Sequence, residues 1–383
     1  MTAANTYRDR FLDEFEQFKT TAPYKAMEAV VEASPWHREE NVGVHTNMVV
    51  AEYLKMAPEG DWTVRDYYGA LAVMYHDIGK PAARTAKYND QRGHYFSYPG
   101  HELISARMFE DIAVTQGVLE PDEIYIISWM IQTHLPWSIK DFNKLQQIRN
   151  TAEIIGMQVF ERTMMADQQG RTSDDWDYNV AKSQEWIDAL KRISPAVSIG
   201  CGTNPYFRSW VIGDTSKFVS AKKILWIPIA ASGTGKSTLC EDLKAKIPNL
   251  NVFSLDTLRH QWYDMNDYNN AFKLSTEDPY FETKANAIYE EMCKQDRHIF
   301  VDNMNLSAKR RASLINVARR NDFVIAAVTM PVAVNTIMDR QMTRIDKSVP
   351  PGLVKNMYMS LTLPQIGEVD VILPSEYSGY KKK

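Results

Sequence analysis

A run of nine residues directly after an apolar segment constrains the fold of this chain more than any other feature. Residues Ala230–Thr238 read AASGTGKST, between the apolar run Ile224–Ile229 and a helical pattern over Lys236–Lys246. Glycines in such a loop let backbone N–H groups curl around phosphate oxygens, and the N terminus of the following helix adds partial positive charge. The sequence therefore predicts a nucleoside triphosphate site between a strand and a helix.

Individual loop residues have distinct expected roles. Lys236 is expected to reach the β- and γ-phosphates, and Ser237 is expected to bind Mg²⁺. Ala230 stands where the usual GxxxxGK[ST] pattern has its first glycine, and we expect the loop to tolerate this small residue at a strand end. ATP or another NTP, together with Mg²⁺, is the expected ligand. The residues expected to contact it are Ser232, Gly233, Thr234, Gly235, Lys236, Ser237 and Thr238.

The pattern around this loop predicts an α/β fold from residue 221 onwards. Apolar runs alternate with helical stretches, which is typical of a parallel sheet covered by helices. The further expected strands are Asn251–Leu255, His298–Val301, Phe323–Met330 and Val369–Leu373, and the further expected helices are Ser307–Arg320 and Val334–Ile345.

Charged residues near the ends of these elements are candidates for phosphoryl transfer. Asp256 follows the second strand, at the sheet edge where ligands of such sheets bind, and a carboxylate there can accept a proton from an attacking hydroxyl. Arg259 lies three residues later and is expected to hold a phosphate of the acceptor. Arg340 and Arg344 lie one helical turn apart, and we expect them to close over the transferred phosphoryl group.

The N-terminal half is predicted to be mainly helical, without a strong strand signal. Proline and glycine then cluster over Ser194–Ser220, which marks a boundary. We therefore expect a multidomain protein with an all-α domain over 1–195, a linker over 196–220 and an α/β domain over 221–383. The expected helices of the first domain include Asn41–Met56, Val64–His76, Glu102–Ile112, Ile124–Thr133, Thr151–Asp167 and Val180–Ile193.

Histidines and carboxylates recur in this helical half in the order His45, His76, Asp77 and Asp167. Imidazoles and carboxylates that converge from different helices can bind a divalent transition metal, which activates water and steadies phosphate oxygens. The sequence therefore predicts a metal site in the helical domain.

Charge and cysteine content limit the partners and the compartment. The net charge of −4 argues against broad nucleic-acid affinity, but residues 222–383 carry 22 Lys and Arg against 18 Asp and Glu, so a polyanion would bind this half more easily. The three cysteines lie far apart, which predicts reduced thiols. No run of 18 apolar residues occurs, so we expect no membrane partner. The reduced thiols, and an N-terminal segment without the layout of a signal peptide, predict a cytoplasmic protein.

The α/β half resembles the polynucleotide 5′-kinase family. That family follows its phosphate loop with a DxxR motif, matched by Asp256 and Arg259, and its lid carries RxxxR, matched by Arg340 and Arg344. The resemblance implies that Asp256 is the general base on the 5′-hydroxyl and that Arg259 binds the neighbouring phosphate. It also implies that Arg344 contacts the donor phosphates. The turn that begins at Asp302 resembles the DxN-type turn of the family, with Asp302 in a supporting role.

The helical half resembles HD-domain metal phosphohydrolases. The string HDIGKP over His76–Pro81 and the segment GHELISA over Gly100–Ala106 match that family. The resemblance implies one or two divalent transition metal ions, and it implies that Lys80 binds substrate phosphate. The implied ligands are His45, His76, Asp77 and Asp167 for one ion, and Asp77, His101 and His134 for a second.

Together the two halves resemble the HD-Pnk end-healing enzymes of bacteria and phages. The resemblance implies removal of 3′-phosphate or 2′,3′-cyclic phosphate by the first half and phosphorylation of 5′-hydroxyl ends by the second. RNA or DNA ends would be the substrates, and a polynucleotide ligase would use the products. Two alternatives stay open: a nucleoside or nucleotide kinase fused to a nucleotidase that acts on small molecules, and a non-catalytic sensor that binds ATP.

Overall fold

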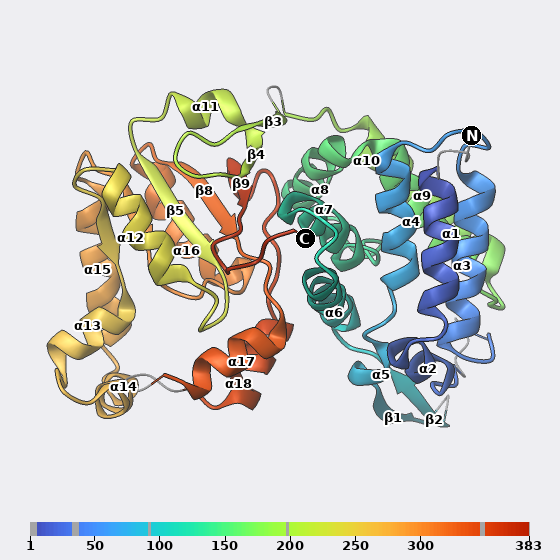
Figure 1. Ribbon diagram of the computed structural model, residues 1–383, viewed down its shortest axis with the longest axis horizontal. Coiled ribbons are helices and arrows are strands. Elements are labelled where there is room, and N and C mark those ends of the chain that lie inside the picture. Colours follow the sequence, from blue (N-terminus) through green and yellow to red (C-terminus); the bar gives the residue numbers. More distant parts are fainter. Residues whose placement is uncertain (1–5, 33–37, 91–92, 197–198, 345–348, 383) are drawn as a thin grey trace. The chain divides into compact units, whose positions relative to one another are not determined.

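The computed structural model (Figure 1) describes residues 6–32, 38–90, 93–196, 199–344 and 349–382. The chain divides into two compact units. The helical unit comprises Met1–Ile112 and Glu123–Ala196, and the α/β unit comprises Ala113–Asp122 and Val197–Lys383. The predicted succession of a helical N-terminal region and an α/β region with a mostly parallel sheet is confirmed.

The helical unit is built from helices that pack around a buried core. Helix α9 packs against α3, α4, α8 and α10, and α4 also packs against α1 and α3. The helices that lie wholly or partly in this unit are α1 (Tyr7–Phe18), α2 (Ala22–Glu28), α3 (Val42–Met56), α4 (Val64–Tyr75), α5 (Lys80–Ala83), α6 (His101–Gln116), α7 (Pro121–Gln132), α8 (Phe142–Ile155), α9 (Met157–Gln169) and α10 (Trp176–Arg192).

Helix α4 leads the chain to two buried polar residues inside this unit, His76 and Asp77. Thr63 caps its N terminus: the Thr63 hydroxyl accepts from the Asp66 N–H, and the Asp66 side chain accepts from the Thr63 N–H. Every residue from Asp66 to Tyr75 is buried, because neighbouring helices cover all faces of the helix. The helix ends at Tyr75 with His76 as its C-cap, so His76 and Asp77 lie in the interior of the unit.

Two local features of this unit differ from the prediction. The expected helix Thr151–Asp167 is two helices, because Gly156 adopts a φ of 105° between α8 and α9, a left-handed backbone that glycine tolerates. In addition, β1 (Thr85–Asn89) and β2 (Gly93–Ser97) form an antiparallel hairpin in a half where we expect no strand. The hairpin is largely exposed, so it lacks the buried alternation that reveals a strand.

The α/β unit contains a seven-stranded sheet in the order β3-β4-β9-β8-β5-β7-β6. Pairing is parallel from β9 to β6, and β3 and β4 add antiparallel strands at the other edge. The strands are β3 (Ile199–Thr203), β4 (Trp210–Asp214), β5 (Ile224–Ile229), β6 (Asn251–Phe253), β7 (Ile299–Val301), β8 (Val324–Thr329) and β9 (Val371–Pro374).

Helices cover this sheet and surround its central strands. Strands β5 and β8 are buried at every residue, as expected for the middle of a parallel sheet. Trp226 of β5 lies in a buried cluster with Phe218 and Leu239. The helices are α11 (Thr215–Val219), α12 (Lys236–Lys246), α13 (Leu255–Trp262), α14 (Tyr268–Glu277), α15 (Phe281–Cys293), α16 (Ala308–Arg320), α17 (Val334–Met342) and α18 (Pro351–Met359).

The segment that we expected as a linker, 196–220, belongs largely to the sheet. It forms β3, β4 and α11, and Ile212 and Gly213 of β4 pair with β9. Gly213 has a φ of 125°, and a Cβ there would lie 2.4 Å from the Asp370 carbonyl oxygen. Glycines at such close backbone contacts also interrupt the alternation of apolar residues. For this reason the sequence did not predict β3 and β4. The expected helix end at Ile345 lies outside the described residues, and α17 ends at Met342.

Candidate active sites

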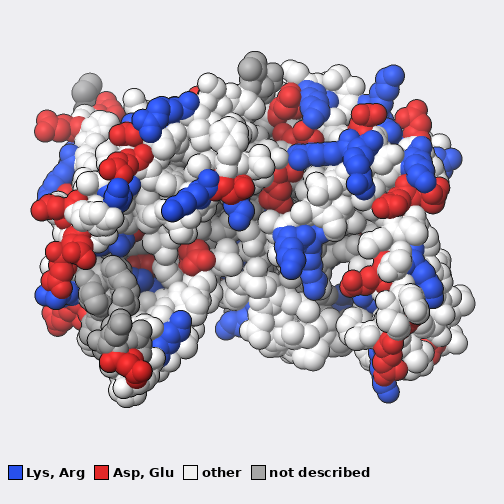
Figure 2. Space-filling view, turned by 180° about the vertical axis from the view of Figure 1, so that it is seen from behind, with Lys and Arg blue, Asp and Glu red and all other residues white. Residues whose placement is uncertain are grey.

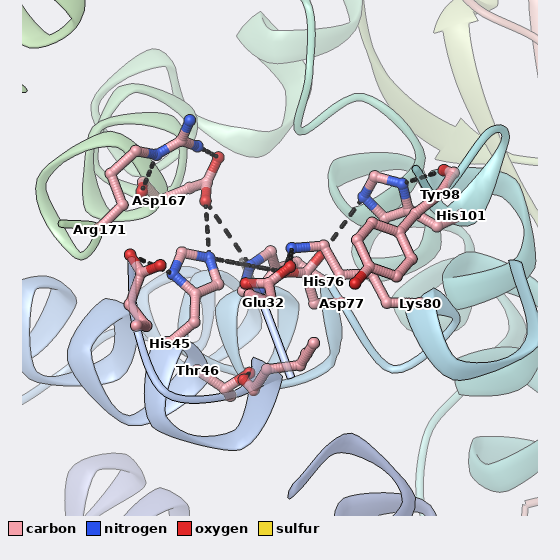
Figure 3. Close-up of polar contacts among 12 residues, drawn as sticks. Glu32, His45, Thr46, His76, Asp77, Lys80, Tyr98, His101, Asp167 and Arg171 are labelled. Carbon is pink, nitrogen blue, oxygen red and sulfur yellow. Dashed lines mark hydrogen bonds and ion pairs between the residues drawn. The ribbon is translucent and has the colours of Figure 1, made fainter. Parts of the chain in front are cut away.

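Five segments of the helical unit bring six candidate ligands into one buried cluster. His45 lies on α3, His76 and Asp77 follow α4, and Asp167 lies on α9. His101 begins α6, and His134 follows α7. Figure 3 shows the His45 and His76 rings facing the Asp167 carboxylate. All six side chains are buried: His45, His76, Asp77, His101, His134 and Asp167.

The first group of donor atoms has the spacing of ligands around one ion. The Nε2 atoms of His45 and His76 lie 3.3 Å apart, and the Oδ2 atom of Asp77 lies 3.5 and 3.1 Å from them. The Oδ1 atom of Asp167 lies 3.2 Å from His45 Nε2 and 3.7 Å from His76 Nε2. Ligands about 2.0–2.2 Å from a tetrahedral or octahedral ion lie about 3.0–3.4 Å apart, so this group fits a divalent cation.

A second group shares the Asp77 carboxylate. The Nε2 atoms of His101 and His134 lie 3.2 Å apart, and Asp77 Oδ1 lies 3.1 Å from the first and 3.8 Å from the second. Asp77 Oδ1 is buried and accepts no hydrogen bond from the part of the chain that the structure describes. The two oxygens of one carboxylate therefore face two different histidine pairs, as in a bridging ligand.

Backbone carbonyls fix the orientation of all four imidazoles. The Nδ1 atom lies 2.7 Å from the Val73 oxygen in His76, from the Tyr98 oxygen in His101 and from the Ile131 oxygen in His134. The corresponding distance from His45 to the Gly170 oxygen is 3.2 Å. A carbonyl requires a proton on Nδ1, so the Nε2 atoms of neutral rings present lone pairs. Two such lone pairs facing each other at 3.2–3.3 Å need a cation or a proton between them.

The electrostatics of the cluster show how strongly these groups depend on one another. Burial disfavours a charge on His45, but hydrogen bonds to Asp167 and Glu39 outweigh burial and raise its pKa to about 9. Burial lowers the pKa of His134 to about 3, and the neighbouring His101 and His76 act in the same direction. Burial opposes ionisation of Asp77 as well, yet His76 and Lys80 hold the pKa of this carboxyl well below its ordinary value. Asp77 is therefore a carboxylate, the form that binds a cation.

Lys80, which the resemblance implies as a phosphate-binding residue, is buried between carboxylates. Its Nζ atom lies 2.7 Å from Glu32 Oε1 and 2.8 Å from Asp77 Oδ2, and 5.5 Å from the centre of the Tyr98 ring. In this arrangement the ammonium neutralises Asp77, and it would have to leave Glu32 to reach a substrate.

The nucleotide loop of the α/β unit has the backbone that its glycines require. Gly233 and Gly235 adopt φ values of 85° and 116°, and Gly235 caps the N terminus of α12. A Cβ on Gly235 would lie 2.4 Å from the Tyr377 carbonyl oxygen. Ala230, in place of the first glycine, is buried in the core and donates its N–H to the Met304 oxygen at 3.2 Å. The loop thus accommodates this alanine.

Lys236 bonds to the loop itself. Its Nζ atom donates to the carbonyl oxygens of Ala231 at 2.8 Å and of Ala230 at 3.4 Å. Ser237 and Thr238 are exposed at the start of α12, so their hydroxyls are accessible to a nucleotide and its cation.

The turn after β7 makes hydrogen bonds both to the segment around the nucleotide loop and to the start of α13. Asn303 accepts the Leu255 N–H at 3.2 Å, and the Met304 carbonyl accepts the Ala230 N–H. Asn305 adopts a φ of 52° and donates to the Pro228 carbonyl at 3.0 Å. The residues that follow Asp302 therefore fix the start of α13 relative to the nucleotide loop, and a supporting role for the Asp302 side chain itself stays a prediction.

Asp256 and Arg259 form a network on the first turns of α13. Arg259 Nη1 lies 2.7 Å from Asp256 Oδ1, and the Tyr268 hydroxyl donates to the same oxygen at 2.8 Å. Arg259 Nε donates to the Ser275 hydroxyl at 3.1 Å. The Asp256 side chain keeps 34% of its exposure, so the carboxylate is positioned and still reachable by a substrate hydroxyl.

The two arginines of α17 occupy different environments. Arg340 donates to the Gly233 carbonyl at 3.0 Å and to the Ser378 carbonyl at 2.7 Å, so it braces the nucleotide loop against the C-terminal segment. Arg344 is exposed and donates to the Ser232 hydroxyl at 3.0 Å. Of the two, Arg344 is the one that a phosphate at the loop would meet directly.

Several site residues escaped prediction because they are distant in sequence from the motifs that they support. Glu32 holds Lys80, Arg171 holds Asp167 at 2.8 Å, and Tyr268 holds Asp256. Only Arg171 carried a usable signal, since it lies four residues after Asp167, just beyond the C-terminal end of α9.

Charged side chains are intermixed over the surface face that Figure 2 presents. Lys and Arg alternate there with Asp and Glu, in keeping with the net charge of −4. The charges on this face therefore produce little long-range attraction for a charged partner, and a partner would have to be recognised here by local contacts. None of the described helices is long and apolar enough to cross a membrane.

Comparison with known families supports the α/β unit as a nucleotide-binding domain. The model of a family described as AAA domain, AAA_33, matches residues 225–364, a range that lies within the α/β unit. It begins in β5 and includes the nucleotide loop and α17. No curated protein matches the chain. The match and the mostly parallel sheet are consistent with a P-loop NTPase-like kinase fold for the α/β unit and with nucleotide binding.

Proposed function

We propose that this protein repairs nucleic-acid ends with two separate active sites. The α/β unit transfers the γ-phosphate of ATP to a 5′-hydroxyl end, and the helical unit removes 3′-phosphate or 2′,3′-cyclic phosphate. RNA or DNA ends of this kind are produced by strand cleavage, and a ligase needs the opposite pair, 3′-hydroxyl and 5′-phosphate. One chain that carries both activities prepares both ends of a break for ligation.

The observation that carries the proposal is the double histidine cluster around Asp77. Four Nε2 atoms and two carboxylates converge from five segments, with every imidazole oriented by a carbonyl. A histidine with a purely structural role needs one hydrogen-bond partner. It gains nothing from an Nε2 lone pair that faces the Nε2 of another imidazole at 3.2–3.3 Å. The arrangement therefore supports a site for divalent ions, in a chain that also contains a P-loop kinase-like unit.

In the kinase reaction, Asp256 would accept the proton of the attacking 5′-hydroxyl. Arg259 and Tyr268 both bond to Asp256 Oδ1 and so hold the carboxylate in one orientation, which favours a positioned general base. Lys236 would exchange its loop carbonyls for the β- and γ-phosphates, and Ser237 would bind Mg²⁺. Arg344, next to Ser232, would neutralise charge that develops on the transferred group.

In the phosphatase reaction, His45, His76, Asp77 and Asp167 would hold one ion, and Asp77, His101 and His134 a second. Such ions supply activation of water and charge neutralisation at the phosphate oxygens. The protein's own contribution is orientation: carbonyls fix the rings, Arg171 fixes Asp167, and Lys80 keeps Asp77 ionised. The buried setting strengthens each of these interactions.

The main alternative is a small-molecule kinase fused to a nucleotidase. Such an enzyme would accept free nucleosides and nucleotides and ignore oligomers. Arg259 favours a polymer acceptor, because a guanidinium beside the general base is suited to a phosphate adjacent to the 5′-hydroxyl. A non-catalytic ATP sensor is a weaker alternative, since it has no need for Asp256 or for paired donor groups.

One experiment tests both activities at once. An oligonucleotide with a 5′-hydroxyl and a 3′-phosphate is incubated with the protein, ATP, Mg²⁺ and Mn²⁺ or Ni²⁺, and both ends are analysed. We expect a 5′-phosphate that requires ATP and a 3′-hydroxyl that does not. Turnover of adenosine and 3′-AMP but not of the oligomer would favour the small-molecule alternative, and no change at either end would refute the proposal.

A further inference from the structure

A cavity of about 440 Å³ lies in the helical unit, and two of its lining residues, Gln168 and Arg171, bond to Asp167. Its walls come from α10, from the end of α9 and from the loop after α7. This volume falls in the range of small-molecule sites and accommodates a nucleoside. Residues that the argument uses are Trp137, Gln168, Arg171, Asn179, Lys182 and Trp186.

Three walls of this cavity are attached to candidate metal ligands. Trp137 lies three residues after His134, and Gln168 directly follows Asp167. Arg171 Nη2 and Gln168 Nε2 lie 2.8 and 3.3 Å from Asp167 Oδ2, the oxygen that does not face the histidines. A group bound in the cavity would therefore contact two residues, Gln168 and Arg171, that bond directly to Asp167.

The composition of the walls suits a nucleobase. The Trp137 and Trp186 rings form a corner, with centroids 5.6 Å apart and planes at 80°, so one ring offers a face while the other offers an edge. Trp186 Nε1 donates to the Ile139 carbonyl at 3.1 Å, which fixes that ring. The amides of Asn179 and Gln168 can donate and accept along a base edge, and aromatic faces stack on any base.

Two cations complete the site. Lys182 is exposed and pairs with Glu185 at 2.9 Å on the surface, a pair of little net stability that a phosphate can replace. Arg171 is held at Asp167 and faces the cavity from the side of the metal ligands. The lining thus offers aromatic rings and two cations, the groups that suit a base and the phosphates on either side of its sugar.

We propose that this cavity binds the base of the 3′-terminal nucleotide while its phosphate lies on the histidine cluster. The inference rests on the proposed phosphatase function and adds that the enzyme recognises a nucleotide as well as a phosphate. Trp137, packed against Trp186, stacks on the base, and Lys182 binds the phosphate on the 5′ side.

The test compares three phosphate esters: an oligonucleotide with a 3′-terminal phosphate, the same oligonucleotide with an abasic terminal residue, and p-nitrophenyl phosphate. We expect wild-type protein to prefer the complete oligonucleotide over the abasic one by about 5- to 100-fold in kcat/KM, the range that stacking of one base supplies. Trp137→Ala should remove this preference, Trp137→Phe should keep most of it, and neither should change hydrolysis of p-nitrophenyl phosphate.

Trp176→Ala is the matched control, because Trp176 lies on the same helix α10 and outside the cavity. Equal kcat/KM values for complete and abasic ends in the wild type would overturn the cavity proposal while leaving phosphatase activity intact. Absence of hydrolysis of all three esters would instead refute the proposed function. Quenching of tryptophan fluorescence by a nucleoside 3′-monophosphate gives an independent reading: we expect saturable quenching that Trp137→Ala weakens and Trp176→Ala does not.

Discussion

The nucleotide loop and the histidine cluster, the two candidate sites for phosphate chemistry, are built in opposite ways. The loop is nine consecutive residues whose own backbone forms the binding surface, and its geometry depends on two glycines with positive φ. The cluster takes its donors from five segments spread over more than a hundred residues, all buried. A local site depends on backbone conformation, whereas an assembled site depends on the packing of a whole unit.

The largest effect should come from Asp77, where the assembled site has its shared carboxylate. Asp77→Ala removes a donor from both histidine groups, so we expect loss of bound metal and of phosphatase activity to background. Kinase activity should persist, because the nucleotide loop belongs to another unit. Elemental analysis and end-specific assays measure the two outcomes, with the exposed Asp61 as the Asp61→Ala control. Full metal content in Asp77→Ala would contradict the ligand assignment.

A second test concerns the stability that the assembled site requires. Lys80→Met leaves the Glu32 and Asp77 carboxylates buried without their shared ammonium, and breaking a buried pair in this way costs about 3–5 kcal/mol. Urea unfolding should show that loss in the helical unit. Adding Glu32→Gln should restore part of the stability, because one of the two uncompensated charges is then gone. An unchanged unfolding midpoint in Lys80→Met would show that the ammonium is dispensable.

The local site should lose activity without losing its fold. Lys236→Ala removes the cation that is expected on the β- and γ-phosphates, so kinase kcat should fall by about 10²- to 10³-fold. Its phosphatase activity and its unfolding midpoint should match those of the wild type. Lys246→Ala, at the other end of α12, is the matched control and should retain kinase activity. If Lys236→Ala impaired both activities, the two sites would not be independent.

The contrast also explains what the sequence could and could not reveal. The nucleotide loop and strands β5 and β8 were predictable, because contiguous apolar runs and a glycine-rich string are local signals. The order of His45, His76 and Asp167 in the sequence indicated a metal site. The distances between their nitrogen and oxygen atoms could be known only from the folded structure. Glu32, Tyr268 and Trp186 carry no pattern that links them to their partners, and they meet only through tertiary packing. The exposed hairpin β1–β2 and the glycine-containing strand β3 lack the apolar alternation on which strand prediction relies.

The smallest effect, and the sharpest test of the local site, is expected at Gly235. Its φ of 116° disfavours any residue with a side chain, and a Cβ would meet the Tyr377 carbonyl at 2.4 Å. We expect Gly235→Ala to cost about 1–3 kcal/mol of stability in the α/β unit and to weaken ATP binding, since the loop amides and the start of α12 must shift together. Gly352→Ala is the control, because a Cβ there meets nothing within 4 Å. Calorimetric titration with an ATP analogue and thermal unfolding of both variants measure the difference. If Gly235→Ala bound nucleotide as the wild type does, the loop backbone would not be the binding surface. The nucleotide loop would then not be a local site in the sense used above.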